Sequence, residues 1–243
     1  MRILAFSKRC AKEILRDPVN LFFGLGFPLI LLFLLSAIQA NIPVDLFAIE
    51  RLAPGISAFG LSFFALFAAS LVAKDRESAF LQRLYTTPLR AQEFILGYIL
   101  PMLPLALCQS LICYLTATVF GLPFTVNILY AVLCNLPMAV FYISFGLMFG
   151  SILTSKQVGG ICGALLTNLS AWLSGVWFDL SLVGGAFESI AHVLPFVHAV
   201  ALGQAALNGN AADFLSHLLP VVFYTLALSV GAVLLFLRQM KKQ

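Results

Sequence analysis

Few side chains in this sequence could carry out chemistry, and those few are far apart. Glu188 and His192 are four residues apart, so they would share one face of a helix. The remaining histidines are His198 and His217. A protein-bound metal needs several ligands that converge on it, and nothing in this spacing makes these residues converge. We therefore expect no metal site, and packing or hydration at a surface is the simpler interpretation.

Two kinds of enzyme lack their motifs here. Ser174-Gly175 and the histidines suggest an intramembrane serine protease, whose nucleophile motif resembles Gly-x-Ser-Gly, but Trp172 occupies the first glycine position. A phosphate-binding loop needs Gly-Lys followed by Ser or Thr, and none of the six lysines has that context. The chain is therefore predicted not to be an enzyme, not to hydrolyse ATP and to bind no cofactor itself.

The elements that must position these residues are apolar helices. The chain is 61% hydrophobic and 10% charged, whereas soluble domains carry about 25% charged residues. Several uncharged runs reach the roughly 20 residues that a helix needs to cross a bilayer. The sequence predicts an all-α integral membrane protein, a single transmembrane domain over residues 1–243. Its six expected spans are residues 19–40, 52–73, 94–119, 127–152, 157–178 and 214–237.

The placement of the cations predicts the orientation of the spans. In a six-span arrangement, thirteen of the fourteen Lys and Arg residues fall on one side, and only Arg51 falls on the other. Cytoplasmic loops are enriched in Lys and Arg, so both termini are expected to be cytoplasmic. The net charge of +4 is therefore a signal of topology, and no nucleic-acid partner is expected.

The first 17 residues are predicted to form an amphipathic helix on the cytoplasmic surface. Ile3, Cys10, Ile14 and Leu15 share one face, and basic residues occupy most of the other. Such a helix lies in the interface of an anionic membrane, so membrane lipid is an expected partner. A frayed basic tail is the alternative. The apolar run begins only near residue 19, so we expect no cleavable signal peptide.

Residues 180–212 are predicted to form a helical hairpin on the outer side, before the last span. Within it, the apolar stretch 189–212 follows Gly184-Gly185 and contains Pro195. If it crossed the membrane, Arg238 and the lysines after it would lie outside, against the charge rule. We therefore expect a re-entrant or interfacial hairpin, packed against protein or water.

Residues 74–92 form the charge-rich loop between the second and third spans. Phe80, Leu81, Leu84 and Tyr85 recur at helical spacing, and Thr87-Pro88 disfavours helix at the preceding residue. We expect one short helix with an apolar stripe, which needs a partner outside the membrane. A solvated loop is the alternative.

The order of these features resembles the membrane-spanning permeases of type-2 ATP-binding-cassette exporters. A basic amphipathic helix precedes six spans, and 52–56 (Leu-Ala-Pro-Gly-Ile) opens the second span like the Pro-Gly entry common in that family. The loop is similar to the family's charged run, followed by Thr87-Pro88-Leu89 and the Ile95-Leu96-Gly97 start of the next helix. Leu194-Pro195-Phe196 is similar to an element that precedes the last span. The resemblance covers nearly the whole chain.

The resemblance implies partners. Residues 74–90 would dock, as a coupling helix, in a groove of a cytoplasmic ATPase subunit, with apolar anchors and charges that set the register. Two copies of that ATPase, carrying ATP and Mg²⁺, and a second permease copy, identical or paralogous, would complete the transporter. The candidate docking residues are Arg76, Glu77, Phe80, Leu81, Arg83, Leu84, Thr87 and Pro88.

The fifth span carries a stripe of small residues, which let membrane helices approach closely. By resemblance, the stripe is a candidate dimer seam against the first span of the second copy; packing within the subunit is the open alternative. The stripe consists of Gly159, Gly163, Thr167, Ser170 and Ser174.

The resemblance also places spans 1, 2 and 5 beside the translocation path. Phe59, Phe63, Asn168 and Trp172 are therefore candidate substrate contacts, with ordinary lipid-facing or core packing as the alternative for each. Glu188, His192 and Pro195 are a candidate outer gate.

These features predict the permease subunit of an exporter in a bacterial inner membrane. The predicted spans contain no charged residue, which disfavours a proton-driven mechanism and favours an amphiphilic or hydrophobic substrate, drug-like or lipid-like. A permease for a polysaccharide or lipid-linked glycan is the alternative within the family. A secondary transporter is the alternative outside it, but the chain lacks the internal repeats typical of that class.

Overall fold

The computed structural model describes residues 2–78 and 91–242, and every regular element among them is a helix. This confirms the all-α prediction for that part of the chain. The α-helices are α1 (Arg2–Arg16), α2 (Pro18–Leu21), α3 (Phe27–Gln39), α4 (Ile49–Gly60), α5 (Phe63–Glu77), α7 (Ala91–Val119), α8 (Asn127–Gly150), α9 (Ser155–Val158), α10 (Leu166–Leu173), α11 (Gly185–Val193), α12 (Pro195–Asn208) and α13 (Ala211–Lys242). Two π-helices, η1 (Phe22–Gly26) and η2 (Gly159–Leu165), and a 3₁₀-helix, η3 (Leu180–Leu182), lie between them.

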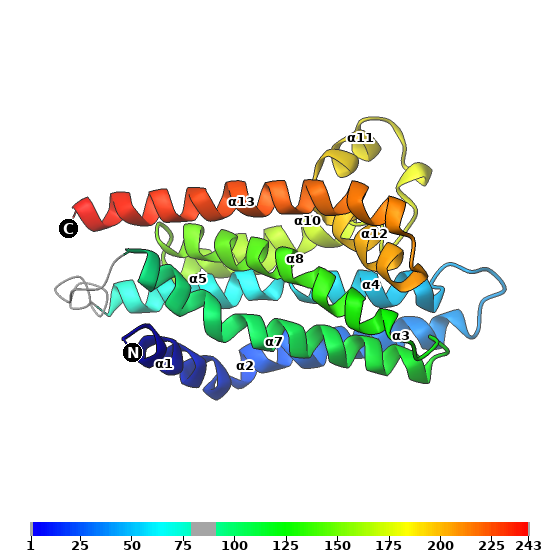
Figure 1. The fold of residues 1–243 in the computed structure, drawn as a ribbon, viewed down its shortest axis with the longest axis horizontal. Coiled ribbons are helices and arrows are strands. Elements are labelled where there is room, and N and C mark those ends of the chain that lie inside the picture. Colours follow the sequence, from blue (N-terminus) through cyan, green and yellow to red (C-terminus); the bar gives the residue numbers. More distant parts are fainter. Residues whose placement is uncertain (1, 79–90, 243) are drawn as a thin grey trace.

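The helices run along one elongated bundle (Figure 1). Helix α1, the end of α5, the start of α7 and the end of α13 lie at one end, which we call the basic end. The α3–α4 connection and the bent pair α11–α12 lie at the opposite end, which we call the hairpin end. The order in which the chain passes between the two ends is the order expected from the cation pattern.

Five helical segments are long and apolar enough to cross a membrane: Pro18–Gln39, Ile49–Glu77, Glu93–Val119, Asn127–Gly150 and Ala212–Arg238. They coincide with five of the six predicted spans, so the described chain has the character of a multi-pass membrane protein. The pair α11 and α12, bent by 69°, passes the same test when both helices are taken together, which gives up to six candidates.

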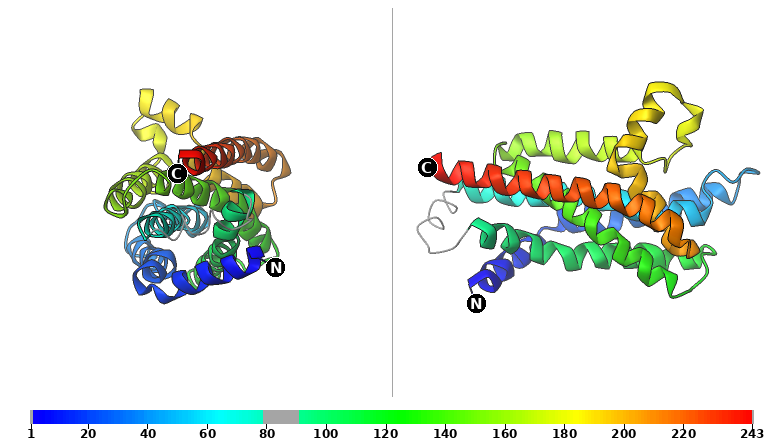
Figure 2. Two further views of the ribbon diagram at one scale, coloured as in Figure 1. Left: turned by 90° about the vertical axis from the view of Figure 1, so that its left-hand side faces the viewer. Right: turned by 45° about the horizontal axis from the view of Figure 1, so that its top comes forward.

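The structure differs from the prediction at the expected span 157–178. Residues 155–173 form a continuous helical run, α9–η2–α10, in which α9 and η2 pack along α5 and α10 contacts α4 and α12 (Figure 2). The run is not among the helices apolar enough to cross by length and composition, because Lys156, Gln157 and Asn168 interrupt its apolar residues. Helices α11 and α12 form a pair with a 69° bend between them, and a re-entrant hairpin at this position stays a prediction.

Helix α1 packs on the chain itself. Phe6, Cys10 and Ile14, spaced by four residues, are buried, and the ring of Phe6 contacts Phe94 and Tyr98 of α7 edge-on. Leu15, predicted to share the apolar face, is exposed instead. The helix predicted over residues 1–17 therefore exists as α1, and much of its apolar face is covered by α7. Its position on the cytoplasmic surface stays a prediction.

The core of the bundle is the contact between α5 and α8. In the segment α4–α5, 89% of the most apolar stretch is buried, against 17% for α13. Small residues make this contact possible. A methyl group added at Gly146 would overlap the carbonyl oxygen of Ala65, and one added at Gly150 would lie 2.6 Å from the carbonyl oxygen of Ala69. The two backbones therefore touch directly.

Candidate functional site

A buried carboxylate joins three helices at the basic end. The side chain of Asp75, in the last turn of α5, accepts hydrogen bonds from both terminal nitrogens of the Arg9 guanidinium. The hydroxyl of Tyr98 in α7 donates a further bond of 2.8 Å to the same carboxylate. Asp75 is 1% exposed. Because a buried carboxylate is costly unless it is paired and hydrogen-bonded, these contacts fix α1 and α7 against the end of α5.

The charges around this carboxylate reinforce the pairing. The hydrogen bond to Asp75 raises the pKa of Arg9 above its usual value, although partial burial of Arg9 acts in the opposite direction. Arg9 also lies 2.8 Å from Glu13 of α1. Burial raises the pKa of the neighbouring Cys10 thiol to about 12, so Cys10 is a neutral packing residue here.

This network was not predicted from the sequence, in which Asp75 belongs to the charged loop 74–92 and Arg9 to the polar face of the N-terminal helix. One feature of the sequence could have indicated it. If the helix is continued beyond the apolar run, Asp75 lies four residues after Leu71 and on the same buried face of α5.

Two predicted docking residues contact the chain's own α8–α9 connection. The guanidinium of Arg76 donates to the carbonyl oxygens of Ser151 and Leu153. The carboxylate of Glu77 accepts bonds of 2.8 Å from the backbone N–H and 2.7 Å from the hydroxyl of Ser155, the first residue of α9. These contacts tie the end of α5 to the start of α9. The other predicted docking residues, which lie outside the described residues, are Phe80, Leu81, Arg83, Leu84, Thr87 and Pro88.

The four predicted path residues line one groove of about 410 Å³, which we call the aromatic groove. Phe59 of α4 and Phe63 of α5 are buried and form its base, whereas Asn168 and Trp172 of α10 are exposed at its rim. The remaining lining residues come from the first span, from η2 and α10, and from the segment after α10: Phe23, Phe27, Leu31, Gly163, Thr167, Ala171, Trp177 and Phe178.

Aromatic edges build the wall of the groove. The ring of Phe63 contacts Phe23, Phe27 and Phe59, with ring centroids 5.6 to 5.7 Å apart. Trp177 packs edge-on against Phe59. A wall of aromatic rings offers apolar and cation-binding faces and few hydrogen-bonding groups, so the groove suits an apolar or amphiphilic ligand.

Both peripheral helices that border the groove contain a π-helical segment, η1 in the first span and η2 before α10. Such segments are rare and occur frequently at functional sites. In η1, a side chain at Gly24 would collide with the ring of Phe67. The π-helical turns therefore lie where helices approach α5 closely beside the groove.

The predicted seam stripe divides between two environments. Thr167, Ser170 and Ser174 are buried within the chain, and the hydroxyl of Ser170 is hydrogen-bonded to that of Tyr142 in α8. Gly163 faces Leu66 of α5, whereas Gly159 is exposed with open space beside it. Packing within the subunit, the open alternative, accounts for the three buried residues. A seam role stays a prediction, and Gly159 is the member with free surface.

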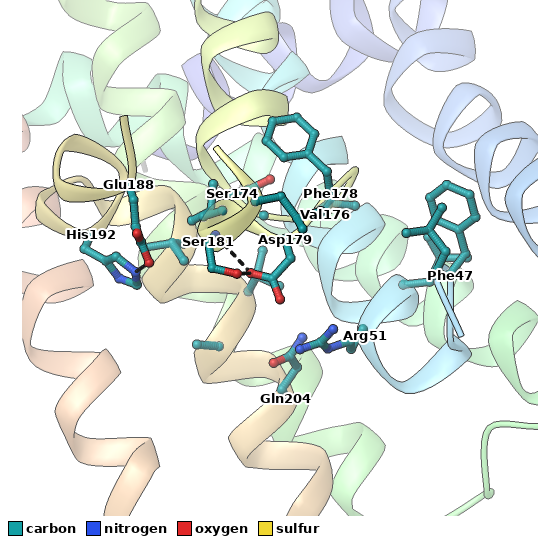
Figure 3. A pocket seen from close by; sticks show the side chains of 18 of the residues that line it. Phe47, Arg51, Ser174, Val176, Phe178, Asp179, Ser181, Glu188, His192 and Gln204 are labelled. Carbon is teal, nitrogen blue, oxygen red and sulfur yellow. Dashed lines mark hydrogen bonds and ion pairs between the residues drawn. The ribbon is translucent and has the colours of Figure 1, made fainter. Parts of the chain in front are cut away.

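A second cavity of about 240 Å³ lies at the hairpin end, between α4, the segment after α10, and α11–α12 (Figure 3). We call it the outer pocket. The predicted gate residues Glu188 and His192 line it, 4.0 Å apart. Pro195 is buried as the first residue of α12, directly after the 69° bend. Among the described residues, no three His, Cys, Asp or Glu side chains group as metal ligands do.

The outer pocket also contains polar residues that the sequence analysis did not select. Arg51, Asp179 and Gln204 meet there from three separate segments of the chain (Figure 3). Of these three residues, the sequence singled out only Arg51, because it lies on the opposite side of the predicted spans from the other cations.

A comparison with protein families identifies the family of the chain. The family model described as ABC-2 type transporter matches residues 1–208 of the 243. None of the curated proteins matches the sequence. Membrane domains of this family are transport subunits that generally work with an ATPase subunit and dimerise. With its multiple apolar helices, the chain thus belongs to the ABC-2 type transporter family as a multi-pass membrane subunit of an ABC transporter.

Proposed function

We propose that this permease exports an amphiphilic or hydrophobic substrate, drug-like or lipid-like, across a bacterial inner membrane. The observation that supports the substrate class is the convergence of Phe59, Phe63, Asn168 and Trp172 on one aromatic groove. Three predicted spans contribute to this groove, and a path formed by several helices can change its shape when they move.

In this proposal, two cytoplasmic ATPase subunits bind ATP and Mg²⁺ and dock on residues 74–90 of two permease copies, which are identical or paralogous. Both termini then lie in the cytoplasm, on the side of the basic end. We propose export as the direction: ATP binding would convert an inward-open path to an outward-open one.

The contacts at the end of α5 suggest how the ATPase acts on the groove. Movement of the docking segment would pass through Arg76 and Glu77 to the α8–α9 connection, because both side chains bond to that connection. The run α9–η2–α10 begins there and carries the groove rim. The ATPase would therefore move the rim through α9.

The groove is tested with Trp172→Ala. Trp172 is 60% exposed, so this change should leave folding intact. With the ATPase subunit co-reconstituted in proteoliposomes, we expect ATP-driven transport of a hydrophobic dye to fall about tenfold, as when an aromatic contact residue is lost. The matched control is Phe223→Ala, another exposed aromatic residue, on α13. Equal transport by both variants would refute the groove as the path.

The docking segment is tested with Leu84→Asp, which places a charge among the predicted apolar anchors. We expect the variant to insert normally but to lose co-purification with the ATPase subunit. Val44→Asp, at an exposed position of the α3–α4 connection, is the control and should keep the ATPase. Retention of the ATPase by Leu84→Asp at wild-type stoichiometry contradicts docking at 74–90.

A further inference from the structure

The outer pocket holds two opposite charges that face a common space. Arg51 lies in the first turn of α4, and Asp179 lies in the segment between α10 and η3. Figure 3 shows the guanidinium of Arg51 beside the amide of Gln204, with the Asp179 carboxylate across from them. All three residues line the same cavity of about 240 Å³.

Neither charge is neutralised by a direct partner. Within residues 2–78 and 91–242, no carboxylate lies within ion-pairing distance of Arg51. Asp179 receives hydrogen bonds from the N–H and the hydroxyl of Ser181, at 3.1 and 2.9 Å, and both go to Oδ1. No hydrogen bond described in this part of the chain uses Oδ2. The Asp179 carboxylate therefore has a free oxygen in the pocket.

Asp179 is ionised at neutral pH. The hydrogen bonds from Ser181 lower its pKa below the usual value, and the charge of Arg51 adds a smaller effect in the same direction. The two charges thus attract each other across the cavity without meeting. A purely anionic ligand would pair with Arg51 and be repelled by Asp179, and a purely cationic ligand would meet the reverse. A ligand with both charges satisfies both residues.

The outer pocket adjoins the aromatic groove. Phe178 lines both cavities, so one ligand could occupy the polar space on one side of this ring and the apolar space on the other. Small-molecule sites commonly combine an apolar lining with a few convergent polar groups. Here the polar groups carry opposite charges, and the apolar lining is aromatic.

We propose that the outer pocket binds the zwitterionic head group of an amphiphile whose apolar tail lies in the aromatic groove. The anionic group, a phosphate or carboxylate, pairs with Arg51 and accepts from the amide of Gln204. The ammonium group pairs with Asp179. The inference deepens the proposed function, and rests on it for the role of the ligand as substrate.

The test is binding to the purified full chain in a neutral detergent, followed by tryptophan fluorescence. The two tryptophans of the chain, Trp172 and Trp177, both line the groove. The probes are hexylphosphocholine, hexyl phosphate, hexyltrimethylammonium and phosphocholine without a tail. We expect hexylphosphocholine to bind about tenfold more tightly than each of the others, because only it has both charges and a tail.

Three variants assign the charges. Arg51→Gln should weaken the binding of hexylphosphocholine about tenfold and leave the binding of hexyltrimethylammonium unchanged or tighter. Asp179→Asn should also weaken the binding of hexylphosphocholine about tenfold, but leave the binding of hexyl phosphate unchanged or tighter. Glu50→Gln is the control, since Glu50 is an exposed carboxylate in the same turn of α4 as Arg51 but does not line the pocket; it should stay within about twofold of the wild type. Thermal unfolding of each variant verifies that it is folded.

Similar affinity for all four probes, or wild-type binding by Arg51→Gln, overturns the proposal. Equally tight phosphocholine without the tail would show a site for soluble zwitterions and would also overturn it. None of these binding results would contradict the result expected for Trp172→Ala in the transport assay. Conversely, a failed transport assay with intact, charge-dependent binding would reject the proposed function and keep the head-group site.

Discussion

The two ends of the bundle use charge in opposite ways. At the basic end, Asp75 is buried and bonded to Arg9 and Tyr98, and three helices meet at one carboxylate. At the hairpin end, Arg51 and Asp179 flank a cavity without forming an ion pair. A paired, buried charge holds helices together, whereas an unpaired charge beside a cavity remains available to a ligand. The comparison predicts that the same kind of substitution has different effects at the two ends.

The largest effect is expected from Asp75→Ala. This change leaves Arg9 and the Tyr98 hydroxyl without their common acceptor. Breaking a buried ion pair costs about 3–5 kcal/mol, but the Arg9 side chain is 35% exposed, so we expect a loss of about 2 kcal/mol in the free energy of unfolding. Thermal unfolding in detergent measures it. Tyr98→Phe, which removes a single donor, should cost about 1 kcal/mol, and an unchanged Asp75→Ala variant would contradict the role of the network.

A smaller effect is expected at the hairpin end. Nδ1 of His198 in α12 lies 3.0 Å from Nδ1 of His217 in α13, and Nε2 of His198 lies 2.9 Å from the carbonyl oxygen of His192. Nε2 of His198 must therefore donate, and its Nδ1 accepts from His217. The contact thus joins α12 to α13.

We expect His217→Phe, which removes the donor of this contact and keeps a ring, to lower the free energy of unfolding by about 1 kcal/mol. Thermal unfolding in detergent measures the effect. Unchanged stability of this variant would argue against the histidine pair.

The smallest effect is expected from Arg51→Gln. Arg51 is exposed and has no carboxylate partner among the described residues. Its loss should change the free energy of unfolding by less than about 0.5 kcal/mol. The same thermal assay compares it directly with Asp75→Ala. A loss as large as that of Asp75→Ala would mean that Arg51 is a structural residue, and the contrast between the two ends would disappear.

The sequence predicted at which end of the bundle each connection lies. Hydropathy and cation placement are summed over many residues, so they do not depend on how any single helix is rotated. Five apolar runs are helices of sufficient length, whereas the uncharged run that follows Lys156 does not form a helix that passes the same test of length and composition. The convergence of Phe59, Phe63, Asn168 and Trp172 followed from the family resemblance. Their role as substrate contacts stays a prediction.

The buried networks could not be predicted, because they depend on how each helix is rotated. Asp75 faces inward and Lys74 is exposed, and the sequence separates the two only if the helix is continued past its apolar run. The seam stripe shows a second reason. Its spacing assumes a regular α-helix, but η2 inserts a π-helical segment over Gly159–Leu165, which rotates the residues after it. Gly159 is thus exposed while Ser170 is buried.

The direct backbone contact between α5 and α8 limits how the protein can change shape. No side chain separates Gly146 from Ala65 or Gly150 from Ala69, so neither helix can slide along the other without a steric clash. The pair acts as a rigid axis that connects the two ends. The lengthwise displacements of a transport cycle must then occur in the loosely covered outer helices, the first span and α13, together with α9–α10.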